Sequence, residues 1–66
     1  MHIQLNGQAH QAAPHITIAA LLAAEGLAER RVAVEVNGAI IPRGQHHLHA
    51  LHEGDHVEIV HALGGG

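Results

Sequence analysis

Two Asn-Gly dipeptides, Asn6-Gly7 and Asn37-Gly38, place the strongest constraint on how this 66-residue chain folds. Each follows a stretch in which polar and apolar residues alternate, as they do in a half-buried strand. Asn and Gly both tolerate the positive φ angles that a tight hairpin turn needs. The sequence therefore predicts two β-hairpins. Their returning strands are residues 8–12, an edge strand, and residues 39–41.

A short amphipathic helix is predicted between the hairpins, over residues 18–25. Thr17 is a suitable N-cap, because its hydroxyl can accept a hydrogen bond from an unpaired backbone N–H. Gly26 fits the position just after a helix, where left-handed backbone is common. Apolar residues at i, i+3 and i+4 form one face: Ile18, Leu21 and Leu22.

The C-terminal third of the chain reads as an irregular stretch followed by a final strand. Leu48 and Leu51 are the residues of the irregular stretch that we expect to fill the core. Period-2 alternation in the final strand points Val57 and Ile59 inward and leaves Val60 on the opposite face. Strands flanking one helix predict a single α+β domain over residues 1–66, with a mixed sheet.

The last three residues, 64–66, are all glycine and follow the final strand without a polar spacer. Because glycine has no side chain to pack and loses much entropy when ordered, we expect a flexible tail. Such a tail can enter a narrow channel in a partner and offers an unhindered terminal carboxylate on Gly66; the alternative is a frayed end. The residues expected to thread the channel are Gly64 and Gly65. An apolar strip beside the tail is the expected partner-binding surface: Val60, Ala62 and Leu63.

The composition argues against several classes of function. No Phe, Trp or Tyr is present to stack on single-stranded nucleic acid, and a net charge of -3 disfavours a phosphate backbone as partner. The absence of cysteine excludes a disulfide scaffold and thiol catalysis. No signal segment and no membrane-length apolar run is visible, so the expected location is the cytosol.

No intrinsic catalytic motif is present. The chain has neither a GxxxxGK[ST] loop nor a GxGxxG turn, so we expect no bound ATP and no other bound cofactor. The chain also has no serine, which excludes a Ser/His/Asp arrangement. Arg43 has two interpretations that the sequence leaves open. It is either a surface cation paired with Glu53 or Asp55, or a contact for an acidic groove in a partner.

Nine histidines are the compositional oddity of the chain, and four of them cluster. Imidazoles are good ligands for zinc, nickel and copper. The spacing matches no established metal motif, so we interpret the cluster as surface residues and predict no metal site. A histidine-rich metal-binding protein remains as an alternative function. The clustered residues are His46, His47, His49 and His52.

Taken together, several segments resemble the ThiS family of sulfur carrier proteins in thiamin thiazole biosynthesis. The resemblance covers essentially the whole chain and implies the ubiquitin-like β-grasp fold, a mixed sheet wrapped around one helix. The segments that carry it are Val34-Glu35-Val36-Asn37-Gly38, Ile41-Pro42-Arg43, Leu51, Gly54-Asp55, Val57-Glu58-Ile59-Val60 and the terminal Gly-Gly pair.

The resemblance also implies the chemistry of the tail. A ThiF-like, E1-type enzyme would use ATP to adenylate the carboxylate of Gly66. Sulfur from cysteine would then replace the adenylate and give a thiocarboxylate. A ThiG-like thiazole synthase would finally take up the sulfur. The chain would thus be a protein co-substrate and not an enzyme. Gly65 matches the glycine before the reactive terminus, and Gly64 is an extra glycine beyond that pair.

Two related functions share this fold and this terminal group. One is a MoaD-like sulfur carrier for molybdopterin synthesis, although the Pro42-Arg43 and Val57–Val60 segments fit ThiS better. The other is a ubiquitin-like modifier joined through Gly66 to lysines of other proteins.

Overall fold

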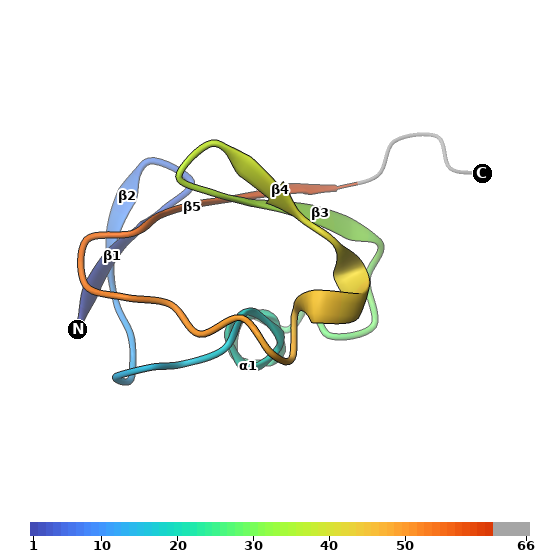
Figure 1. Cartoon of the computed structure of the whole chain (residues 1–66), viewed down its shortest axis with the longest axis horizontal. Coiled ribbons are helices and arrows are strands. Elements are labelled where there is room, and N and C mark those ends of the chain that lie inside the picture. The colour runs from blue at the N-terminus through green and yellow to red at the C-terminus, as the bar shows by residue number, and fades with distance from the viewer. Residues whose placement is uncertain (62–66) are drawn as a thin grey trace.

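The computed structural model describes residues 1–61, which form a five-stranded sheet with a helix packed against one face (Figure 1). This arrangement confirms the predicted α+β class and matches the β-grasp layout that the resemblance implies. The elements in chain order are β1 (His2–Leu5), β2 (Gln8–Gln11), α1 (Ile18–Ala24), β3 (Val32–Val36), β4 (Ala39–Ile41), the 3-10 helix η1 (Arg43–Gln45) and β5 (His56–His61).

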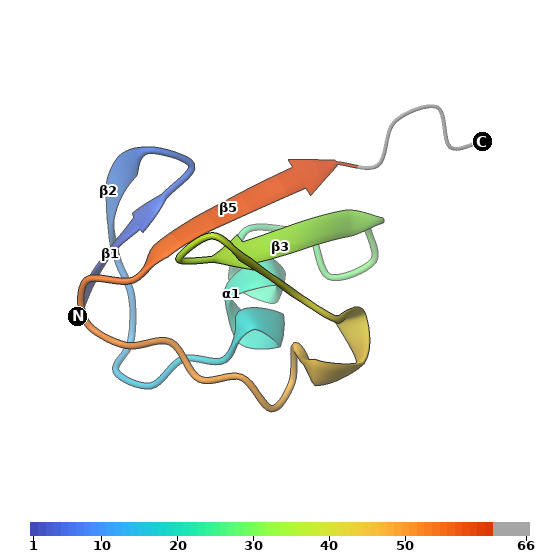
Figure 2. The same ribbon diagram turned by 45° about the horizontal axis from the view of Figure 1, so that its top comes forward.

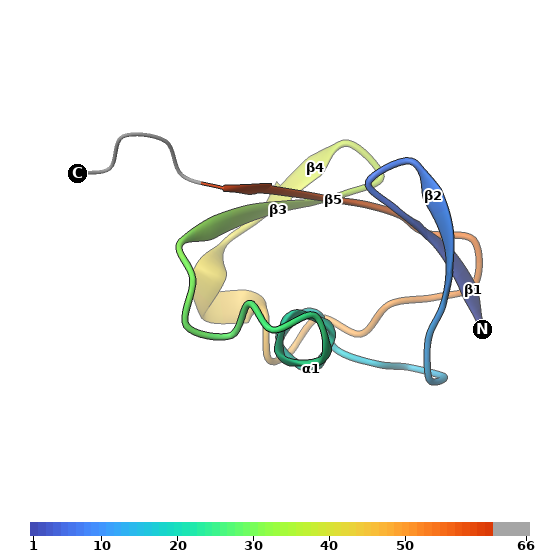
Figure 3. The ribbon, with the colours of Figure 1, turned by 180° about the vertical axis from the view of Figure 1, so that it is seen from behind.

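The sheet has the strand order β2-β1-β5-β3-β4, so the first and last described strands lie side by side at its centre. β1 and β5 run parallel, and the other neighbouring pairs run antiparallel, which makes the sheet mixed. The connections that carry α1 and η1 pass along the same face of the sheet (Figures 1 and 3). The opposite face, which we call the outer face, is not covered by another element of residues 1–61.

Both Asn-Gly turns form as predicted. Asn6 and Asn37 each have a φ of 52°, and Gly7 and Gly38 follow with φ of 80° and 87°. These left-handed conformations fit the two-residue hairpin turn that joins antiparallel strands. The first hairpin returns along β2, which lies at a sheet edge and ends one residue earlier than predicted.

α1 begins and ends at the predicted signals. The Thr17 hydroxyl accepts a hydrogen bond from the N–H of Ala20 at 3.1 Å, as an N-cap does. At the other end, Gly26 has a φ of 75° and Leu27 donates its N–H to the carbonyl of Leu22 at 2.7 Å. That bond is the long bond of a Schellman motif. Glu25 is the C-cap, so the helix is one residue shorter than predicted.

The core lies between α1 and the inner face of the sheet. Ile18, Leu21 and Leu22 supply the helix side of it, as the i, i+3, i+4 spacing predicted. Burying such side chains contributes about 1.5–3 kcal/mol each relative to leaving them in water. The remaining buried apolar residues are Ile3, Val34, Val36, Leu51, Val57 and Ile59.

The segment before β5 corrects one prediction. Leu51 is fully buried, but Leu48 is 72% exposed and fills no part of the core. Backbone bonds fix this segment against the start of α1: Ile18 donates to the carbonyl of His49 at 3.0 Å, and Leu51 donates to the carbonyl of Ile16 at 2.8 Å. This alignment turns the Leu48 side chain outward.

His46 is the buried residue that the prediction of surface histidines missed. It is 6% exposed, and its Nε2 lies 3.1 Å from the carbonyl oxygen of Ile41. Because that polar atom has a partner, burying the imidazole leaves no unsatisfied group. The adjacent His47 is exposed, as predicted.

Candidate functional site

The outer face carries the described part of the predicted partner-binding strip. Val57 and Ile59 are buried, whereas Val60 is 53% exposed, so the predicted alternation along β5 is confirmed through Val60. Ala33 of β3 lies directly opposite Val60, which gives the face a small apolar surface near the end of β5. Ile40 of β4, 63% exposed, adds apolar surface further along the same face.

The rest of the predicted site lies outside the described residues. This applies to Ala62 and Leu63, to the threading residues Gly64 and Gly65, and to the reactive terminus Gly66. Val60 and His61 are therefore the described residues that immediately precede that site in the sequence.

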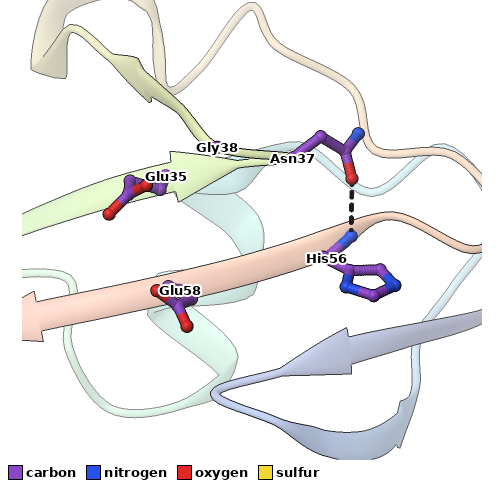
Figure 4. Close-up of a pocket in the computed structure, with 5 residues that line it drawn as sticks. All are labelled: Glu35, Asn37, Gly38, His56 and Glu58. Carbon is purple, nitrogen blue, oxygen red and sulfur yellow. Dashed lines mark hydrogen bonds between the residues drawn. The ribbon is translucent and has the colours of Figure 1, made fainter.

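A shallow hollow of about 500 Å³ lies on the outer face near the start of β5 (Figure 4). Glu35 and Glu58 line it from β3 and β5 and are directly opposite each other in the antiparallel register. Directly opposed like charges destabilise a sheet. The other lining residues are Asn37, Gly38 and His56.

Asn37 joins the second hairpin turn to the start of β5. Its side-chain oxygen accepts a hydrogen bond from the backbone N–H of His56 at 2.9 Å (Figure 4). Its side-chain nitrogen donates to Oδ1 of Asp55 at 3.0 Å. The turn is thus positioned by side-chain bonds as well as by its backbone geometry.

The pKa of the Asp55 carboxyl is lowered by its hydrogen-bond partners. Desolvation by itself would raise its pKa, but this is outweighed by hydrogen bonds from the His52 backbone N–H and the Asn37 amide. The nearby His52 and His49 rings act in the same direction when protonated, so the pKa of Asp55 lies below its ordinary value. The His52 N–H is 2.9 Å from Oδ2.

These bonds overturn one interpretation of Arg43. Glu53 accepts hydrogen bonds from the His2 backbone N–H at 3.1 and 3.2 Å, and Asp55 is bonded to Asn37 and His52. Neither carboxylate pairs with Arg43. The loop before β5 carries both acidic residues toward β1 and the second turn, away from η1.

The clustered histidines do not converge. His46 is buried against Ile41, while the rings of His52 and His15 meet edge-on with centroids 6.4 Å apart. Within residues 1–61, no three His, Asp or Glu side chains come together in a way that could hold a metal ion. In the same range, no helix has the length and apolar character needed to cross a membrane.

The opposed Glu35 and Glu58 were missed by the sequence reasoning. The signal was present, because each glutamate stands between inward-facing apolar residues and so had to face outward. Their direct opposition depends on the register of β3 against β5, which pairs residues 21–29 positions apart and has no local signature.

Comparison with known proteins identifies relatives along the whole chain. The family model described as the ThiS family matches residues 3–66. The crystal structure of the thiamine biosynthesis protein ThiS from Geobacter metallireducens superposes with a TM-score of 0.87 at 30% identity, covering all of both chains.

Two proteins named thiazole synthase also match over 66 residues. The one from Magnetococcus marinus is 44% identical and the one from Paramagnetospirillum magneticum is 38% identical. All of this chain is covered in each match, but only 20% of each relative. The chain therefore spans about a fifth of the length of these relatives.

Proposed function

The chain belongs to the ThiS family, and on that premise we propose that it is a sulfur carrier protein of thiamin thiazole biosynthesis. The observation that carries the proposal is the family match over residues 3–66, which includes the glycine tail together with the folded domain. The superposition on a ThiS structure over all of both chains supports the same conclusion.

In the proposed cycle, the reactive group is the C-terminal carboxylate of Gly66. A free carboxylate is a poor electrophile. An E1-type, ThiF-like enzyme therefore lets this carboxylate attack ATP, which forms an acyl adenylate and releases pyrophosphate. A cysteine-derived sulfur nucleophile then attacks the acyl carbon and AMP leaves. The product is a thiocarboxylate, in which a C–S bond has replaced the C–O bond to AMP.

The folded domain contributes binding and position and no catalytic group. Binding energy from residues remote from the reacting atom can hold the carboxylate in line with ATP. Glycines at 64 and 65 let the extended tail pass through a narrow channel, because they have no Cβ. The protein is thus a co-substrate of the enzymes that act on its terminal carboxylate.

The consumer of the sulfur is a ThiG-like thiazole synthase. The two relatives named thiazole synthase contain a region similar to this whole chain, which favours the thiazole route over molybdopterin synthesis. The enzyme that consumes the sulfur must bind the carrier's C-terminal thiocarboxylate. The presence of a carrier-like region within relatives named thiazole synthase fits this partnership.

Intact-protein mass spectrometry tests the proposal directly. The protein ending at Gly66 is incubated with ATP, a ThiF-like enzyme and a sulfur donor. The product should be heavier by the difference between one sulfur and one oxygen atom, with the change mapped to Gly66. Adduct mass at another residue, or an isopeptide bond from Gly66 to lysine, would contradict the carrier function.

Two altered tails provide matched controls. Deleting Gly66 leaves a glycine terminus but shortens the reach by up to ~3.3–3.6 Å. Appending one alanine after Gly66 moves the carboxylate in the opposite direction. Both variants keep the folded domain intact, and both should be converted much more slowly than the parent. Equal conversion of all three proteins would show that the position of the carboxylate is not recognised.

A further inference from the structure

All of the chain's lysine and arginine charge gathers at one end of the molecule. The three residues are Arg30, Arg31 and Arg43, and the chain has no lysine. Arg30 and Arg31 lie in the connection from α1 to β3, and Arg43 begins η1. Both segments lie at the end of the sheet where β5 terminates, as Figures 1 and 2 show from two directions.

Two adjoining hollows join these arginines into one surface. A hollow of about 560 Å³ has Arg31, Arg43, Val60 and His61 among its lining residues. A second hollow, of about 200 Å³, has Arg30 and Arg43 among its lining residues. Because Arg43 and Val32 line both hollows, the three arginines lie around two neighbouring hollows. We call this region the cationic end and define it as Arg30, Arg31, Arg43, Val60 and His61.

The arginines are not neutralised within the described residues. The cation–carboxylate contacts in residues 1–61 join His2 to Glu53 and His10 to Glu25, and neither involves an arginine. Glu29, which shares the turn with Arg30, is exposed and forms no ion pair there. The whole chain carries a formal charge of -3, so the positive charge of this end is opposite in sign to the net charge of the protein.

We propose that the cationic end docks onto an acidic surface of the enzyme that activates Gly66. The inference rests on the proposed function, since that function supplies the enzyme. β5 ends at His61 inside this region, and the chain continues from there toward Gly66. An attachment at this point fixes the origin of the tail, which positions a reacting group more effectively than a contact at the far end of the domain.

The lining of the larger hollow favours a protein surface over a small anion. Besides Arg31 and Arg43, its lining includes the apolar residues Val32, Ala33 and Val60. A hollow lined by both apolar residues and arginines matches a protein interface, where arginine is enriched and its planar fork binds carboxylates with two hydrogen bonds. Complementary charge of this kind also accelerates association.

A pair of charge-matched double variants tests the docking. Arg31→Gln with Arg43→Gln removes two positive charges at the cationic end. Gln8→Glu with Gln11→Glu adds two negative charges on β2, at the opposite edge of the sheet, and so changes the net charge equally. All four side chains are exposed, and circular dichroism checks that each variant folds. Stopped-flow association with a ThiF-like adenylating enzyme is then measured at low and high salt.

The arginine variant should associate about tenfold more slowly at low salt and lose most of the salt dependence of the parent. The variant with Gln8→Glu and Gln11→Glu should associate at nearly the same rate as the parent. Equal rates for the parent and the arginine variant, or equal slowing of both variants, would overturn the inference. So would saturable binding of inorganic phosphate that shifts the amide signals of residues 31–33 and 43–47, since it would identify a small-anion site.

The same proteins separate this inference from the proposed function. If the parent acquires the sulfur mass on Gly66 while the arginine variant associates and reacts equally well, only the docking inference fails. If the parent associates in an arginine-dependent way but Gly66 is never modified, the docking stands and the carrier function fails.

Discussion

The side-chain oxygen of Asn6 accepts a hydrogen bond from the backbone N–H of Ile59 at 2.8 Å, which ties the first hairpin turn to β5. The backbone N–H of Asn6 also donates to the carbonyl of Val57 at 2.9 Å. The β1–β5 register itself reaches only Leu5 and Val57, so the Asn6 side chain extends the contact between the two central strands. Asn6 thus serves both as a turn residue with φ of 52° and as a link across the sheet.

Replacing Asn6 separates these two roles. Asn6→Ala should lower the free energy of unfolding by about 2–4 kcal/mol, because it leaves the Ile59 N–H unpaired and puts a Cβ-bearing residue without local hydrogen bonds at positive φ. Asn6→Gly tolerates the φ and should lose less, and Asn6→Asp, which keeps an acceptor, should lose least. Urea unfolding measures the series. An alanine variant as stable as the aspartate variant would contradict the role of the bond.

Acid should weaken the fold through Asp55. The pKa of this carboxyl is lowered in the folded state, so its stabilising contribution is complete above the unfolded-state pKa, about 3.9, and is lost as pH falls through the folded-state pKa. Asp55→Asn removes that titration. The stability difference between parent and variant should therefore be largest at neutral pH and shrink below about pH 4. Thermal unfolding across this range is the measurement, and a constant difference at every pH would refute it.

Relieving the opposed carboxylates should stabilise the protein. Glu35 and Glu58 face each other directly across β3 and β5, and like charges in that position repel. Glu58→Gln should raise the free energy of unfolding by roughly 0.2–1 kcal/mol at low ionic strength. The gain should fade in high salt, where exposed charges are screened. A gain that is independent of salt would point to a cause other than repulsion.

The features that the sequence predicted correctly are those determined by neighbours in the chain. The φ angles at Asn6 and Asn37, the Thr17 cap and the Gly26 terminus each depend on a few adjacent residues, and all were confirmed. The outward position of Val60 followed from alternation within one strand.

The features that the sequence left out depend on contacts between distant segments. Leu48 is more apolar than His46, yet His46 is buried because the backbone alignment of its loop against α1 and the carbonyl of Ile41 select it. The gathering of Arg43 with Arg30 and Arg31 requires η1 to lie beside the start of β3, which no local pattern encodes.

Val60 should be needed for binding the adenylating enzyme. Its side chain is 53% exposed on the outer face and forms part of the cationic end, so an apolar contact there would be lost and a new charge desolvated in a Val60→Asp complex. Affinity should fall at least tenfold, a loss of about 1.4 kcal/mol. Because aspartate is also a poor strand residue, Val60→Thr serves as a second variant, which keeps the β-branch and replaces one methyl group with a hydroxyl. It should weaken binding less than Val60→Asp and leave the fold unchanged.

Leu48→Asp is the matched control for Val60→Asp, since it introduces the same charge at an apolar residue that is 72% exposed and lies outside both β5 and the cationic end. Its affinity for the enzyme should equal that of the parent in isothermal titration calorimetry. Thermal unfolding of each variant shows that the folded domain is retained. If Val60→Asp binds as tightly as Leu48→Asp while both remain folded, the end of β5 is not the docking surface, and the enzyme must reach Gly66 from another side of the domain.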